Sequence, residues 1–570
     1  MRTLSVLPLL GVLITLGSVS TSAPAAITLD LSYVNTASPS YIRFKNWVDQ
    51  AVAGNPGYAF SATDAAYVYR VQGGAAYANL AIQMVEAQVV AAEAAIAANQ
   101  VPEVAGDQYL YVGGMIGDLA LVYDWCNPLL TPSQRTRWAA YAEQAVWNVW
   151  HHDTASWGGH PAPWAGWSID NPGNNYHYSF LEATMYWTFA SNSSPWRTFL
   201  ETQKIPPLTA YFAALPGGGS REGTGYGLSH QRLFELYRFW RDNTGTNLAT
   251  QNTHLNDSLD YWIHATVPTR DFVAPLGDQA RVSEPAIYDY HRNVVLQARA
   301  MSNNAAAQQR ATWWLSNISM PQMSSGFNFR HDMLPVGSGG QVPTALYYRA
   351  TGTGALFART AWDTNAMWLS FMAGPYLESH AHQDQGSFTL YAHHWLAVTE
   401  NIWTHSGIQQ GTDVHNVVRF VKNGQTINQR DNTTSNMTVT PGANGVLDVS
   451  ANLTPAYAGN PDITSWQRTL HFANRVLRVS DQFAIGSGVQ AVFQLNVPSM
   501  PVISGHTARA GDLAINVLTP ANATLTLVDW HSLDNDEFRS GWKLEVRGNG
   551  NQFVVDLSEA SDAIFANGFQ

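Results

Sequence analysis

A change of hydrophobic periodicity near residue 345 most limits how this 570-residue chain can fold. Before that point apolar residues recur at helical spacing. The segment from Ala75 to Ala98 is rich in alanine, and Thr131-Pro132-Ser133-Gln134 has the residues of a helix N-terminus with a capping box. Loops rich in glycine and proline separate the expected helices. Successive helix pairs joined by short loops predict an α/α toroid over residues 26–345.

After residue 345 the pattern becomes typical of β-strands. The turn pairs Asn423-Gly424 and Asn444-Gly445 lie between short runs of alternating or β-branched residues, as hairpins require. The sequence therefore predicts an antiparallel β-sandwich over residues 346–570, with a further small β unit after about residue 500 as an option. The expected fold class is α+β multidomain, with the toroid followed by the sandwich. The expected strands are 367–372, 387–391, 414–420, 446–449, 475–479, 491–497 and 524–528.

The first 25 residues are organised like a secretory signal peptide. Met1-Arg2 gives a positive start, the stretch from Leu4 to Val19 is mostly apolar, and Ala23-Pro24-Ala25 supplies small residues for cleavage. The alternative is a membrane anchor, which the proline and glycine residues within the short apolar stretch disfavour. No later run of about 18 apolar residues is evident, so we expect a periplasmic or secreted protein without membrane contact after cleavage. Cys126, the single cysteine, is expected to be a buried apolar residue.

Composition narrows the class of partner. Charged residues make up 13% of the chain, and the formal net charge is −12, which disfavours nucleic acid and anionic membranes. Aromatic residues reach 12% and include 21 tryptophans, which suits sugar-binding grooves. An anionic polysaccharide stays compatible with this charge because a few local arginine or histidine residues can reverse the field inside a cleft.

Two histidine clusters in the C-terminal half are candidates for chemistry. In extended chain, His380, His382 and Asp384 share one face, because alternate residues point the same way. These groups indicate a base, a metal site, or a hydrogen-bonded loop that caps the sandwich. His415-Asn416 precedes a strand and becomes a third candidate ligand if it lies near the first cluster.

Two further clusters lie in the helical half. Asn174-Asn175-Tyr176-His177 follows a segment that contains Trp157, Trp164 and Trp167, and its amides and imidazole suit the binding of a carboxylate, although a helix cap would use the same residues. The glycine-rich loop 217–227 presents Tyr226 with little around it to pack against. The alternative for this loop is a flexible helix connection.

Taken together, these clusters resemble the heparinase II/III-like polysaccharide lyases, a family with a helical toroid followed by a β-sandwich. The resemblance covers most of the mature chain. Its most specific segments are Ser379–Phe388, His415-Asn416, Glu222–Tyr226, and the Trp466–Leu470 and Val476–Asp481 strand pair.

The resemblance implies a role for each residue of a β-elimination site. It makes Tyr226 the catalytic acid or acid/base, His380 the second catalytic histidine, and His177 with Asn174 or Asn175 the group that neutralises the substrate carboxylate. We further expect the substrate to contact Arg221, Glu222, Arg281, Trp157, Trp164 and Trp167.

The resemblance also implies a structural zinc in the sandwich and no organic cofactor. His382 and His415 match two of the metal ligands. The third position is expected to be an aspartate, but this sequence has Thr399 there, with Glu400 beside it, so Glu400 would have to complete the site.

Two rival functions use the same sequence differently. A glycoside hydrolase on a toroid would need two carboxylates across the scissile bond, for which Asp170, Glu222 and Glu284 are candidates. A non-catalytic glycan-binding protein would have little need for converging proton-transfer groups. The sequence leaves open the polymer, endo or exo action, syn or anti elimination, and whether the protein is a dimer; its sparse basic residues favour polymers that carry carboxylates alone.

Overall fold

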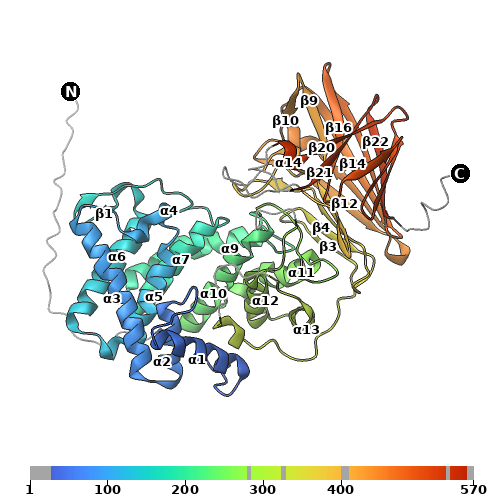
Figure 1. The fold of residues 1–570 in the computed structure, drawn as a ribbon. Helices are drawn as coiled ribbons and strands as arrows, with labels where there is room; N and C mark the ends of the chain where they lie inside the picture. Colours follow the sequence, from blue (N-terminus) through green and yellow to red (C-terminus); the bar gives the residue numbers. More distant parts are fainter. Residues whose placement is uncertain (1–26, 279–283, 322–328, 400–409, 534–539, 561–570) are drawn as a thin grey trace, which may run out of the picture.

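The computed structural model describes residues 27–278, 284–321, 329–399, 410–533 and 540–560. The expected signal peptide, Arg281 and Glu400 lie outside these residues. Helices occupy the N-terminal part and antiparallel sheets the C-terminal part, in the order the sequence predicts (Figure 1).

The helical half is built from helices that pack closely against the next helix but one in the chain, such as α5 with α7 and α10 with α12. The predicted start at Thr131 is confirmed, since its hydroxyl accepts a hydrogen bond from the Gln134 backbone N–H at 3.2 Å. The α-helices are α1 (Pro39–Val52), α2 (Ala62–Gln72), α3 (Ala75–Ala97), α4 (Gly106–Tyr109), α5 (Val112–Trp125), α6 (Pro132–Trp150), α7 (Asn175–Ala190), α8 (Ser194–Phe199), α9 (Ile205–Ala213), α10 (Gly227–Thr244), α11 (His254–Ala265), α12 (Asp289–Met301) and α13 (Ala305–Asn317).

Helix α3 departs from one expectation. By length and composition alone it is apolar enough to cross a membrane, which the sequence analysis did not anticipate. In the structure it packs against α2, α5 and α6 through a stripe of small apolar residues: Ala78, Ala81, Val85, Val89 and Ala92. Cys126, just after α5, is buried as predicted, and burial raises the pKa of its thiol to about 12.

The C-terminal half contains three larger antiparallel sheets (Figure 1). The eight-stranded sheet has the order β12-β13-β14-β15-β22-β19-β18-β17, and the two five-stranded sheets have the orders β10-β9-β16-β21-β20 and β3-β4-β5-β7-β8. Asn423-Gly424 forms the predicted hairpin turn between β9 and β10, with both residues at positive φ. The strands are β3 (Tyr347–Ala350), β4 (Ala355–Arg359), β5 (Trp368–Met372), β7 (Phe388–Ala392), β8 (His394–Ala397), β9 (Val418–Lys422), β10 (Gln425–Ile427), β12 (Asn436–Pro441), β13 (Leu447–Asn452), β14 (Ile463–Ala473), β15 (Val476–Ile485), β16 (Val489–Val497), β17 (Pro501–Ser504), β18 (Thr507–Ala510), β19 (Leu513–Thr519), β20 (Thr524–Asp529), β21 (Trp542–Arg547) and β22 (Gln552–Glu559).

The option of a separate small unit after residue 500 is wrong for the described residues. Strands β17 to β22 join the eight-stranded sheet and the β9–β16 sheet instead, and the short helix α14 (Trp530–Leu533) connects β20 to β21. The smaller pairs are β1 (Ser156–Trp157) with β2 (His160–Pro161) and β6 (Pro375–Tyr376) with β11 (Thr433–Thr434).

A buried ion pair connects the sandwich core to the loops that carry the histidine motifs. Arg468 on β14 and Asp481 on β15 are fully buried and form a bidentate pair, with both N···O distances 2.8 Å. The same guanidinium donates to the carbonyl oxygens of Gly386 and Asn416, which lie beside the two histidine motifs. The core therefore fixes these loops through one charged side chain.

We expect Asp481→Asn to lower the free energy of unfolding by about 3–5 kcal/mol, because removing one partner leaves the Arg468 charge buried and uncompensated. Chemical denaturation monitored by tryptophan fluorescence measures this. Asp556→Asn is the matched control: Asp556 pairs with Arg478 in the same bidentate manner, but the Arg478 side chain is 50% exposed. We expect a change of under about 1 kcal/mol there; similar losses in both variants would contradict the role of the buried pair.

Candidate active site

Two loops of the helical half lie against each other and form the base of the site. The backbone N–H of Thr224 donates to the carbonyl of Leu276 at 2.9 Å, and the N–H of Gly225 donates to that of Asp278 at 3.0 Å. In return, the N–H of Asp278 donates to the carbonyl of Glu222 at 3.1 Å. The loop before Tyr226 is therefore a paired segment, rather than a flexible connection.

Glycine is required where these loops cross. Gly223 has φ +113°, and a Cβ atom there would lie 2.4 Å from the carbonyl oxygen of Leu276. Gly277 faces it with φ +55°, and its Cβ would lie 2.8 Å from the Gly223 Cα. Since both contacts are with backbone, no side-chain movement could relieve them. The two glycines allow the approach that puts Asp278 next to Tyr226.

Tyr226 from the helical half meets His380 from the sandwich half. The Tyr226 hydroxyl lies 3.0 Å from the His380 ring nitrogens, and the ring centroids are 4.5 Å apart. Tyr226 ends the short 3₁₀ helix η5 (Thr224–Tyr226), directly before α10. A phenol and an imidazole in contact can exchange a proton.

Asp278 holds both histidines of the H-x-H motif. Its Oδ2 lies 2.6 Å from His380 Nδ1, and its Oδ1 lies 2.8 Å from His382 Nε2. Gln410 Nε2 donates to Oδ1 as well, at 3.1 Å. These hydrogen bonds outweigh burial and lower the pKa of the Asp278 carboxyl to about 2, so it is ionised at neutral pH. If His380 Nδ1 carries the hydrogen donated to this carboxylate, Nε2 of the neutral ring is left as an acceptor facing Tyr226.

Sequence reasoning did not find Asp278. It lies about 100 positions before the histidines that it binds, in a Pro-Leu-Gly-Asp segment without a recognisable motif. The histidines converge although their segment is a turn rather than the extended chain expected, because Asp278 binds one of them with each oxygen. The one signal in the sequence was the presence of Gly223 and Gly277, whose loops lie against each other. A single sequence does not show which glycines of distant loops come into contact.

The structure separates the roles of the two asparagines. Asn174 is buried and caps α7: its Oδ1 accepts from the Tyr176 N–H at 3.1 Å, and its Nδ2 donates to Glu222 Oε1 at 3.1 Å. Both ends of its amide are used inside the protein, so its expected contact with substrate is wrong. Asn175 is half-buried and its side chain lines a cavity, so it is the asparagine available to a ligand.

Glu222 is also a structural residue rather than a surface for substrate. Its side chain is fully buried, and its Oε1 accepts from the backbone N–H of Asn175 at 3.4 Å and lies 3.8 Å from His380 Nε2. Burial raises the pKa of this carboxyl well above its usual range, so the protonated form is favoured. The expected direct contact of Glu222 with a polymer is therefore wrong. The Glu222 carboxyl instead accepts hydrogen bonds from Asn174 and Asn175.

His177 lies on the first turn of α7 but is buried. Its Nδ1 is 3.1 Å from the carbonyl oxygen of Ser168, and its ring packs edge-on against Trp150. Burial lowers the pKa of the imidazole to about 4, so it is neutral at pH 7. Its Nε2 is buried without a hydrogen-bond partner, which leaves one polar atom for a group that enters beside α7.

The expected sugar-stacking tryptophans differ in exposure. Trp157 is buried, donates to the Tyr109 hydroxyl at 3.2 Å and packs against Tyr141, so its predicted contact with substrate is wrong. Trp164 is half-buried and donates to the Asn148 carbonyl at 2.9 Å, whereas Trp167 is 47% exposed.

Arg221 is held at the boundary between the two halves. Its Nε donates to the Gly352 carbonyl at 3.1 Å, and its guanidinium lies over the Tyr211 ring. This contact with the start of the sandwich makes Arg221 a residue that joins the halves.

Of the three residues expected to hold zinc, His382 and His415 are described and Glu400 is not, so the zinc site stays a prediction. His382 uses Nε2 to bind Asp278, while His415 Nδ1 lies 2.7 Å from the Thr399 hydroxyl, at the position where an acidic ligand was expected. The two imidazole centroids are 5.1 Å apart and His415 Nε2 has no partner, but among the described residues no group of three potential ligands is present.

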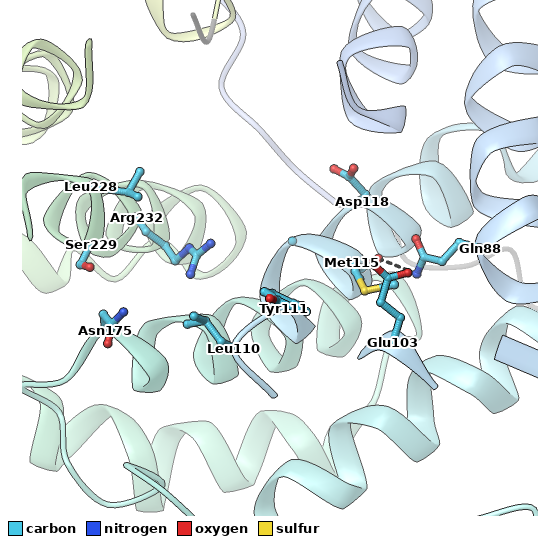
Figure 2. A pocket seen from close by; sticks show the side chains of 11 residues that line it. Gln88, Glu103, Leu110, Tyr111, Met115, Asp118, Asn175, Leu228, Ser229 and Arg232 are labelled. Carbon is cyan, nitrogen blue, oxygen red and sulfur yellow. Dashed lines mark hydrogen bonds between the residues drawn. The ribbon is translucent and has the colours of Figure 1, made fainter. Parts of the chain in front are cut away.

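A cavity of about 510 Å³ opens beside Asn175 (Figure 2). Its size lies within the roughly 300–1,000 Å³ typical of ligand sites. Asn175 forms one end of its lining, together with Leu228 and Ser229, which follow Tyr226 at the start of α10. Asn175 thus borders a space large enough for part of a polymer, and Glu222, which contacts Asn175, lies 3.8 Å from His380.

Comparison with solved structures identifies the architecture. A heparan sulfate lyase (HepC) from Pedobacter heparinus matches 94% of this chain and 86% of its own, with a TM-score of 0.59 and 15% identity. Heparinase III matches 95% and 88%, with a TM-score of 0.62 and 13% identity. A chondroitin AC lyase from Streptomyces coelicolor A3 matches 93% and 81%, with a TM-score of 0.54 and 11% identity.

No protein-family profile matches the chain, and no curated protein matches its sequence. At these identities the likeness establishes the fold. The chain has the heparinase-like polysaccharide lyase fold, a helical toroid followed by an antiparallel β-sandwich.

Proposed function

We propose that this chain is a polysaccharide lyase that cleaves a uronic-acid-containing polysaccharide by β-elimination. The observation that carries the proposal is the contact of the Tyr226 phenol with His380, whose Nδ1 is hydrogen-bonded to the Asp278 carboxylate. The solved structures with this fold are described as lyases of heparan sulfate and chondroitin, which supports the same reaction class.

The substrate carboxylate is the first difficulty of the reaction. Removing the C5 proton of a uronate while its carboxylate is charged would create a dianion, so donors must first neutralise that charge. The Asn175 amide is the side chain open to the cavity for this purpose, at the N-terminus of α7, where the helix dipole also favours an anion. The raised pKa of Glu222 favours its neutral form, so this carboxyl next to Asn175 does not repel the substrate carboxylate. His177 lies on the same first turn of α7, and its Nε2 has no hydrogen-bond partner.

Proton transfer follows from the Tyr226–His380 contact. The base takes the C5 proton, the C5–H electron pair forms the C4=C5 double bond, and the C4–O4 bond breaks as Tyr226 donates a proton to O4. If the proton and the leaving group are on the same face of the sugar, Tyr226 serves as base and acid in turn. If they are on opposite faces, His380 Nε2 is the base, with its Nδ1 hydrogen held by Asp278.

The rival hydrolase has weaker support from the side chains. Glu222 is fully buried, and the Asp170 side chain is 82% exposed and paired with Lys204. A hydrolase needs two carboxylates on either side of one glycosidic bond, so this buried glutamate is poorly placed to be one of them.

The location of the protein and its partner follow from the N-terminal residues and the proposed reaction. We infer export to the periplasm or the medium from the leader-like residues 1–25, and an anionic polysaccharide as the partner. No organic cofactor is needed, because the elimination uses only the proton-transfer groups described above.

We expect Tyr226→Phe to lower turnover by about 10³-fold or more, because the variant has no proton to deliver to O4. A panel of polyuronates monitored by ultraviolet absorbance measures this, since elimination leaves an unsaturated sugar that absorbs and hydrolysis does not. An unchanged melting temperature would show that the variant folds. Activity near that of the wild type would remove Tyr226 from the mechanism.

We expect Asp278→Asn to reduce kcat by on the order of 10²-fold with little change in KM, because Asp278 acts through His380 and not on the sugar. Adding Tyr226→Phe to this variant should cause less than the product of the two single losses, since both residues serve one proton path. Asp260→Asn, which breaks the Arg310 pair on α11, is the control and should leave kcat unchanged. Multiplicative losses in the double variant would indicate a purely structural Asp278.

We expect Glu222→Gln to keep the fold, because burial raises the pKa of the Glu222 carboxyl and so favours the protonated form, which glutamine resembles in size and in its lack of charge. A carboxyl with a raised pKa binds a proton when folded and releases it when unfolded, so the stability of the wild type should fall between pH 5 and pH 8 relative to the glutamine variant. Urea titrations at both pH values measure the difference. Relative to Glu222→Gln, Glu222→Ala should cost about 1–3 kcal/mol at either pH, because Asn174 Nδ2 loses its acceptor; a stability difference between the wild type and the glutamine variant that does not change with pH would contradict a protonated Glu222.

A further inference from the structure

The cavity beside Asn175 is lined mainly by residues of two helices, α10 and α5. Leu228, Ser229 and Arg232 line it from α10, at positions three to four residues apart along one face. Tyr111 and Met115 line it from the start of α5, and Glu103 comes from the 3₁₀ helix η1 (Glu103–Ala105). The cavity therefore includes the residues two and three positions after Tyr226 and continues toward α5 and η1 (Figure 2).

Two large apolar side chains are exposed in this cavity. Tyr111 is 49% exposed and Leu228 is 51% exposed, although both stand next to well-buried helix positions. An exposed phenol ring offers a flat apolar face with a polar edge, which suits the face of a sugar ring. The cavity thus has a surface suited to a pyranose ring.

Charge in the cavity is mostly negative. Arg232 is the only basic residue among the described residues that line it, and its guanidinium extends from α10 toward Tyr111 (Figure 2). Its Nε lies 2.9 Å from Glu182 Oε2, and the Arg232 side chain is 35% exposed. Glu103 and Asp118 line the same space. One carboxylate of a substrate can pair with the exposed part of the Arg232 guanidinium. A second anionic group on the substrate would lie near the carboxylates of Glu103 and Asp118 and would be repelled.

The acidic groups in and next to the cavity differ in how fully they are ionised at neutral pH. Burial raises the pKa of Asp118 to about 6 and that of Glu182 to about 7, while Glu103 is exposed. At neutral pH the cavity therefore holds at least two negative groups against one guanidinium. A sulfated sugar brings extra charge that Arg232 alone cannot balance.

We propose that this cavity is a sugar subsite for a uronate unit without sulfate, in which Tyr111 contacts the sugar ring, Arg232 binds the carboxylate, and Glu103 with Asp118 disfavours sulfate groups. The inference rests on the proposed lyase function and narrows its substrate class. It distinguishes this chain from the solved structures described as acting on heparan sulfate or bound to chondroitin sulphate.

The test compares matched polymers that differ only in sulfation: heparan sulfate with its fully desulfated form, and chondroitin sulfate with chondroitin. We expect the full chain to cleave at least one unsulfated polymer with a kcat/KM about tenfold or more above that of its sulfated partner. Glu103→Gln should reduce this preference several-fold by removing an exposed negative charge. Arg232→Gln should raise KM for the unsulfated polymer about tenfold, with a smaller effect on kcat.

Arg197→Gln is the matched control for Arg232→Gln. Arg197 is 34% exposed and pairs with Glu201, but it lies outside the cavity, so KM should not change. An equal or higher kcat/KM for the sulfated polymers, or an Arg232→Gln variant with unchanged KM, would overturn the subsite while leaving the lyase proposal intact.

Calorimetric titration of Tyr226→Phe with oligosaccharides from each matched pair tests the subsite without turnover. Tighter binding of the unsulfated member, weakened by Arg232→Gln, would support the subsite even if no polymer on the panel is cleaved. Equal or tighter binding of the sulfated member, or no binding of either, would overturn it. Absence of any cleavage would contradict the lyase proposal alone.

Discussion

The Asp278 carboxylate between two imidazoles is the interaction on which the candidate active site depends. The helical half supplies the carboxylate and Tyr226, whereas the sandwich supplies His380 and His382. Each oxygen binds one histidine, so the position of the sandwich loop relative to Tyr226 is set by a buried, charged group rather than by apolar packing alone. Hydrogen bonds to an ionised carboxylate are about twice as strong as neutral ones, which suits a joint between two domains.

Buried polar groups support this joint from both sides. In the toroid, Glu222 binds the α7 N-terminus and lies 3.8 Å from His380. In the sandwich, Arg468 holds the carbonyl oxygens next to both histidine motifs while Asp481 balances its charge. Polar groups without water must be satisfied by specific partners, so these networks allow few alternative arrangements. The proton-transfer pair therefore lies on a rigid base, although its residues come from loops.

The electrostatic character of the site differs from that of a general anion-binding surface. The chain carries a formal net charge of −12, and the cavity beside Asn175 has one guanidinium among carboxylates. The proposed recognition of an acidic polymer would rely on a few placed donors, such as the Asn175 amide and the end of α7, instead of a broad positive field. The tryptophans contribute unequally, since Trp157 serves the core while Trp167 is exposed.

Local sequence patterns determined the secondary structure and the candidate residues. Helical periodicity and the capping box at Thr131 specified α6, and the Asn423-Gly424 turn specified a hairpin, because both signals act over a few residues. The motifs also selected Tyr226 and His380, since few other reasons place such groups among glycines and next to strands. Only the tertiary structure decided that Asn175 and not Asn174 is open, that Glu222 and Trp157 are buried, and that Asp278 belongs to the site. Burial and contacts between distant loops arise from packing of the whole chain, and neighbouring residues in one sequence carry no record of them.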